Sequence, residues 1–118
     1  MAGQFRAARR TFKSASAIAQ HLRVKVDSDG RVSLAGASDP DVGTAARAAH
    51  AANEEIGVDL ASLEGTVICI AAVTIAAGAS VYGAASGQVN VTNTGAKVGI
   101  ALNGATAGQQ VEVLRRPL

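Results

Sequence analysis

Asp29-Gly-Arg-Val-Ser-Leu34 and Ser86-Gly-Gln-Val-Asn-Val91 share one residue pattern, separated by 57 positions. Two further pairs of matching segments follow in the same order: Val42-Gly-Thr-Ala45 with Val98-Gly-Ile-Ala101, and Ile56-Gly-Val58 with Val111-Glu-Val113. The offset shortens to 56 and then to 55 residues, one residue at a time, where loops are expected. Similarity at a nearly fixed offset indicates an internal duplication. The sequence therefore predicts two copies of one module.

Each module is expected to consist of short β-strands. Leu22-Arg-Val-Lys-Val26 alternates apolar and charged residues, which predicts a strand with one face in solvent. Asp27-Ser-Asp-Gly30 is a turn in which Gly30 can adopt a positive φ, so residues 31–34 return as the hairpin partner. Turn signals recur about every 8–12 residues, the spacing of an all-β sandwich or barrel. Further strands are predicted at residues 42–45, 80–82, 88–91, 97–102 and 110–114.

Two segments fit this pattern less directly. Residues 45–55 have high helix propensity, but the matching segment of the second copy contains Gly104 and Gly108. We therefore expect a strand, a loop with at most one helical turn, and a strand. Residues 66–74 are short and rich in Val and Ile, which predicts a fully buried central strand.

The composition predicts one small folded domain. Hydrophobic residues make up 48% of the 118 residues, charged residues 17%, and the net charge is +2, which argues against a disordered chain. A single cysteine excludes a disulfide framework, and one cysteine with two separated histidines cannot supply the ligands of a structural zinc site. The uncharged run at 65–96 lacks the roughly 20 strongly apolar residues of a spanning helix. No signal peptide fits the basic N-terminus, so synthesis in the cytoplasm and no membrane contact are expected.

The charges are distributed unevenly along the chain. Residues 1–26 carry six cations and no acid, whereas residues 27–64 carry eight acids and two cations. Residues 1–20 also lack the alternation of a strand, with at most two helical turns near 14–20. We therefore expect residues 1–20 to form an extended N-terminal arm and residues 21–118 to form one all-β domain, a sandwich or a barrel. A basic arm beside an acidic middle predicts contact with an acidic surface, and the alternative is a solvated tail.

No catalytic or metal-binding constellation is recognisable. His21 and His50 have no motif partner, and Cys69 lies within an apolar strand, where it is expected to be a small core side chain. Asp27-Ser-Asp-Gly30 resembles the start of a calcium loop, but its glycine comes too early and Ser38 stands where a bidentate Glu is required. We therefore expect no enzyme activity, no cofactor and no metal.

Five segments form a recognisable set: residues 23–33, 75–82, 85–89, 97–105 and 111–114. The most distinctive is Lys97-Val-Gly-Ile-Ala-Leu102, preceded by Gly95 and followed by an Ala/Gly turn and Val111-Glu-Val-Leu114. Over about residues 12–114, this set resembles the small capsid decoration (cement) proteins of tailed bacteriophages. The resemblance implies a small β-barrel or β-tulip-like domain that binds the outside of the expanded phage head and locks neighbouring major capsid subunits together. It also implies a structural virion protein that contacts copies of itself, with a homotrimer as the expected assembly.

The expected contacts with the capsid lie in the arm and near the C-terminus. Arginines pair with carboxylates in a bidentate geometry, and aromatic side chains act as apolar anchors. The candidate contact residues are Phe5, Arg6, Arg9, Arg10, Phe12, Lys13, Arg115 and Arg116.

Two alternatives belong to other classes of protein. A basic-armed nucleic-acid-binding β module is supported by the arm, but Tyr82 is the only aromatic residue outside the arm on which a base could stack. A lipoyl or biotin carrier domain also has two repeated β modules, and Lys97 lies near a turn, but the residues that flank a modified lysine are missing.

Overall fold

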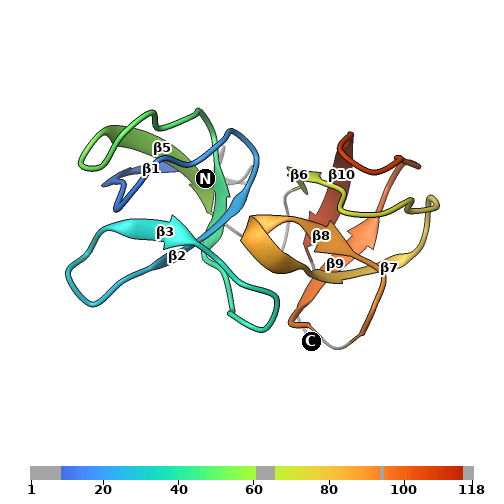
Figure 1. Ribbon diagram of the computed structural model, residues 1–118. Helices are drawn as coiled ribbons and strands as arrows, with labels where there is room; N and C mark the ends of the chain where they lie inside the picture. The colour runs from blue at the N-terminus through green and yellow to red at the C-terminus, as the bar shows by residue number, and fades with distance from the viewer. Residues whose placement is uncertain (1–8, 61–65, 94, 116–118) are drawn as a thin grey trace, which may run out of the picture.

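The structure, a computed structural model, describes residues 9–60, 66–93 and 95–115, which form two five-stranded antiparallel sheets side by side (Figure 1). The first sheet contains β1 (Arg9–Lys13), β2 (Arg23–Val26), β3 (Val32–Leu34), β4 (Gly43–Ala45) and β5 (Glu55–Leu60). The second contains β6 (Thr66–Ile70), β7 (Ser80–Gly83), β8 (Val89–Asn90), β9 (Lys97–Ala101) and β10 (Gln110–Arg115). We call residues 9–60 module 1 and residues 66–115 module 2. The predicted all-β fold is confirmed.

The two sheets have the same topology, which confirms the predicted duplication. Their strand orders are β1-β5-β4-β2-β3 and β6-β10-β9-β7-β8, so each strand of module 1 has its counterpart five strands later. Irregular contacts repeat as well: Ile18 bridges Ala49 in module 1, and Ile75 bridges Ala105 in module 2. The one-residue drifts in offset lie in the loops, as expected.

Each sheet curls until its two edge strands approach each other. The parallel bridge between Ser14 and Val32 connects the end of β1 to β3, and the parallel bridge between Ala71 and Val89 does the same for β6 and β8. Closure of this kind shields sheet edges from pairing with other chains. The predicted β-barrel is therefore present as two small barrel-like modules, one for each copy of the repeat.

Each module has its own hydrophobic core, and the two cores use equivalent positions. The fully buried core residues of module 1 are Ile18, Val24, Val32, Ala45, Ala49, Ile56 and Val58. Their counterparts Ile75, Val81, Val89, Ala101, Ala105, Val111 and Val113 are all buried in module 2. The alternation of inward β-branched residues along each strand thus builds the same core twice.

The N-terminal segment differs from the prediction. Residues 9–13 form β1, which pairs with β5 in the register Arg9↔Asp59 to Lys13↔Glu55. Residues 14–20 continue into the bridges made by Ser14 and Ile18. The expected arm therefore does not include residues 9–20, because these residues supply the first strand of module 1; residues 1–8 lie outside the described residues.

Two strand predictions need correction. Residues 66–74 were expected as a central strand, but β6 ends at Ile70 and lies at the edge of its sheet, with alternating burial. The charged face of β2 was expected in solvent, but Arg23 is fully buried because module 2 covers it.

The helix-prone segment at 45–55 is not helical. β4 ends at Ala45, Ala49 makes an isolated bridge and β5 begins at Glu55, as the repeat predicted. Gly30 has the expected positive φ, +86°. The one helical element in the described part of the chain is a 3₁₀ turn at Ala85–Gly87, and no helix there has the length and apolar character to cross a bilayer.

Candidate functional site

The junction between the modules is held by polar contacts. The backbone N–H of Gly87 donates to the carbonyl of Ala35 over 2.8 Å, and that of Ala96 donates to the carbonyl of Ala37 over 2.9 Å. Gly95 permits this approach, because a Cβ there would collide with the carbonyl of Ala37. The segment at 35–41 of module 1 therefore lies directly against module 2.

Arg23 is the central side chain of this junction. It projects from β2 with 1% of its side chain exposed, and its guanidinium donates to carbonyl oxygens of both modules. The Nη2 atom lies 3.0 Å from the oxygens of Gly36 and Ala84, and Nε lies 3.1 Å from that of Gln88. These bonds fix the guanidinium and compensate for part of its desolvation.

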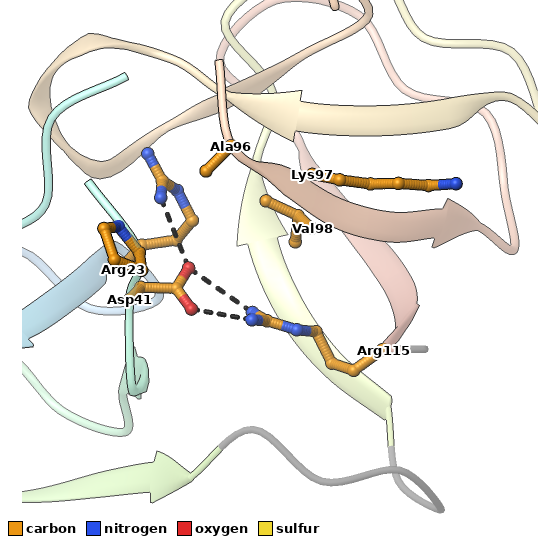
Figure 2. A pocket seen from close by; sticks show the side chains of 7 residues that line it. Arg23, Asp41, Ala96, Lys97, Val98 and Arg115 are labelled. Atoms are coloured by element: carbon orange, nitrogen blue, oxygen red, sulfur yellow. Dashed lines mark hydrogen bonds and ion pairs between the residues drawn. The ribbon is translucent and has the colours of Figure 1, made fainter. Parts of the chain in front are cut away.

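Asp41 of module 1 connects Arg23, also of module 1, to Arg115 of module 2. Its carboxylate accepts from Arg23 Nη1 at 3.3 Å and from Arg115 Nη2 at 2.6 Å, with only 2% of the Asp41 side chain exposed (Figure 2). Arg115 adds a longer contact of 3.4 Å from Nη1, which makes its approach bidentate. One buried carboxylate thus connects β2 with β10, and we call Arg23, Asp41 and Arg115 the junction cluster.

A pocket of about 220 Å³ lies next to the junction cluster. Pro40, Ala96 and Val98 form its apolar wall, and Lys97 stands at the rim with its side chain extended away from Asp41 (Figure 2). By the repeat offset of 56, Pro40 and Asp41 correspond to Ala96 and Lys97, so the same segment of each module lines this pocket.

The predicted contact residues have different environments. Arg9 pairs with Asp59 at 2.8 Å while its side chain stays 64% exposed, and this pairing raises the pKa of Arg9. The guanidinium of Arg10 lies 4.9 Å from the ring centre of Phe12, a cation–π contact. Lys13 is exposed at the end of β1. Phe5, Arg6 and Arg116 lie outside the described residues.

Two other predicted contact residues are partly or largely buried. Phe12 packs against the core of module 1, so its ring is a partly buried core side chain. Arg115, with 12% of its side chain exposed, is bound to Asp41. The structure therefore places Arg9 and Lys13 on one face of β1 and Arg10 with Phe12 on the other face, and it places Arg115 at the junction between the modules.

Cys69 and His21, which were considered as candidates for catalysis or metal binding, have environments typical of structural side chains. Burial raises the pKa of the Cys69 thiol to about 12, which keeps it protonated and poorly nucleophilic. Desolvation lowers the pKa of His21, an effect that Asp59 partly opposes. In the described ranges, no three His, Cys, Asp or Glu side chains are grouped as metal ligands.

Sequence reasoning missed the junction cluster. Arg23 was assigned to a solvent face, and Asp41 was part of a turn next to Pro40. One signal was available: the equivalents of Arg23 and Asp41 in the second copy are Ser80 and Lys97, so the repeat itself does not require these charges. Charged residues that interrupt a duplicated pattern are candidates for contacts between the copies.

The comparison with solved structures finds a protein of similar fold. The fold is similar to the crystal structure of the N base of head fiber gp8.5 in bacteriophage phi29, with a TM-score of 0.76 and 17% sequence identity. The match covers 94% of this chain and 98% of that chain. This likeness shows the fold. No protein-family model matches the sequence, and the search of curated proteins finds no match.

Proposed function

We propose that this protein is a structural component of a phage virion. It binds the outer surface of the expanded head and cements neighbouring major capsid subunits, as a homotrimer and without catalytic activity. The observation that carries the proposal is the likeness of nearly the whole chain to the N base of a phage head fiber. The resemblance of residues 12–114 to capsid decoration proteins supports the same role independently.

The architecture suits a load-bearing part of a shell. Two small cores are joined by buried ionic and backbone contacts, so a force applied to one module is transmitted to the other. The buried thiol of Cys69 is poorly suited to act as a nucleophile.

Strand β1 is the proposed capsid contact. Arg9, Arg10 and Lys13 lie on this strand with exposed side chains, and the basic segment before it contains Arg6. Arginine forms bidentate bonds with carboxylates, and a trimer that reaches several capsid subunits gains affinity through effective concentration.

Co-sedimentation with undecorated, expanded heads of the phage that encodes this protein tests the proposal. We expect saturable binding at a fixed ratio to the capsid subunit, and light scattering of the free protein should give three times the 11.8 kDa chain mass. Substituting Arg6, Arg9 and Arg10 together by Ala should remove head binding, while Arg47→Ala, at an exposed loop position, should leave it unchanged.

A protein that stays in the supernatant with these heads is not a cement protein. If the triple variant instead loses salt-dependent binding of DNA or RNA and still attaches to heads, the basic segment serves nucleic acid.

A further inference from the structure

The pocket between the modules carries more positive than negative charge. Arg23 and Arg115 share the single carboxylate of Asp41, and Lys97 adds a cation at the rim. Asp39, a second carboxylate that acts on the same region, is paired with Lys25 at 3.2 Å and accepts from the backbone of Gly36. Within the described residues, the junction cluster therefore keeps one positive charge that no carboxylate balances.

The guanidinium of Arg115 is the group of the junction cluster that could bind an anionic ligand. Both of its terminal nitrogens point to Asp41, whereas its Nε donates to no residue that the structure describes. In the same part of the chain, no buried side-chain nitrogen or oxygen lacks a partner, so this Nε is reached by solvent. Because Arg115 lines the pocket, an anion that entered it would meet a guanidinium whose orientation Asp41 already fixes.

The size and lining of the pocket restrict the ligand. A volume of about 220 Å³ is below the roughly 300–1,000 Å³ typical of cofactor sites, so it suits a single side chain. Pro40, Ala96 and Val98 would contact the methylene groups and Arg115 the charged end. The ammonium group of Lys97, which extends away from Asp41 (Figure 2), would act on the ligand from the rim.

We propose that this pocket binds a glutamate or aspartate side chain of a partner protein. Resting on the proposed function, the inference identifies the partner as the phage shell, whose carboxylate would dock at the junction of the two modules. The docked carboxylate balances the excess charge, so attachment to the shell also tightens the contact between the modules.

Titration of the isolated protein tests the pocket without any capsid. Sodium propionate carries the same end group as a glutamate side chain, and propionamide is its neutral control. We expect saturable NMR shifts at the amides of Lys97, Val98 and Arg115 with propionate and none with propionamide. Lys97→Gln should weaken the binding about two- to five-fold, as expected for a rim charge. Arg115→Met should abolish it, and Arg47→Gln should leave it unchanged.

Three outcomes would overturn the assignment. The first is the absence of saturable shifts with propionate, and the second is equal affinity in wild type and Lys97→Gln, a variant that does not touch the junction cluster. The third is markedly tighter binding of inorganic phosphate, which would indicate a phosphate-bearing ligand instead of a protein carboxylate.

A second assay separates this inference from the proposed function. If wild-type protein binds heads, Lys97→Glu should weaken head binding more than Arg47→Glu, since only the first places a negative charge at the pocket. Equal binding by both variants excludes the pocket as a shell contact while the cement role stands. Failure of the wild type to bind heads contradicts the proposed function, whereas the propionate titration still decides whether the pocket binds carboxylates.

Discussion

The two modules share one topology but differ in charge. Residues 9–60 carry seven cations and seven acids, whereas residues 66–115 carry only Lys97, Glu112 and Arg115. The register pair Arg9↔Asp59 on the outer face of module 1 corresponds to Thr66↔Leu114 in module 2. The two hydrophobic cores are apolar at equivalent positions in both modules.

This difference shows which positions determine the fold. Strand pairing and core packing depend on the inward residues, since a one-residue slip would expose all of them. The outward residues are less constrained, and the charge of the two modules differs at these positions. At the junction cluster, charged residues outside the two cores form the ion pairs that connect the modules.

The largest expected effect on stability comes from the junction cluster, which is formed by residues of both modules. Asp41→Asn leaves two buried guanidinium groups without a carboxylate and should lower the free energy of unfolding by about 3–5 kcal/mol. Urea denaturation measures this. Asp59→Asn is the control, because its partner Arg9 is mostly exposed, and it should change stability much less. Equal losses in the two variants would mean that Asp41 does not hold the modules together.

Equivalent core substitutions test whether the two cores are alike. Ile18→Ala and Ile75→Ala each remove a fully buried side chain and should each cost about 2–5 kcal/mol. Thermal and urea unfolding of both variants should show one common transition, because the junction couples the modules. A separate transition for the substituted module would contradict this coupling.

Substitutions in the turns before β2 and β7 should change stability by a smaller amount, and in opposite directions in the two modules. His21 and Gly78 occupy equivalent positions with φ of +72° and +87°. Left-handed backbone costs a residue other than glycine about 1–2 kcal/mol, so Gly78→Ala should destabilise by that amount and His21→Gly should be stabilising. Gly104→Ala is the control, since that glycine lacks a positive φ and an added Cβ would have its nearest neighbour at 3.5 Å. If Gly78→Ala and Gly104→Ala were equally stable, backbone strain would not explain the difference.

The smallest expected effect is a pH dependence that module 1 alone carries. Desolvation lowers the folded-state pKa of His21 below the unfolded value, so the unfolded state binds more protons at mildly acidic pH. The contribution of His21 to the free energy of unfolding should therefore be fully present above about pH 6.5, and it should be lost as the pH falls from there toward the folded-state pKa. Urea midpoints between pH 7.5 and 5 should show the decrease in the wild type and a weaker one in His21→Gln. An unchanged slope in that variant would assign the effect to other groups.

The position of β1 was predictable from the repeat, although its own pattern was not informative. Subtracting the offset of 57 from Thr66–Ile70 gives Arg9–Lys13, the observed strand. Arg10, which is exposed, stands where module 2 has the buried Val67 and so interrupts the apolar alternation, which made the local pattern resemble an arm. The edge position of β6 could not be predicted, because an apolar strand reads the same at an edge and in the centre of a sheet.

By itself, the sequence determined the all-β class, the duplication and the inward residues of both cores. These follow from side-chain alternation and turn chemistry, which act between residues close together in the chain. Only the tertiary structure decided that Arg23 is buried and that Arg115 meets Asp41 across 74 positions. Such contacts depend on how the two folded modules pack against each other. The charges are removed from water only by this packing, so their effect on stability arises only in the tertiary structure.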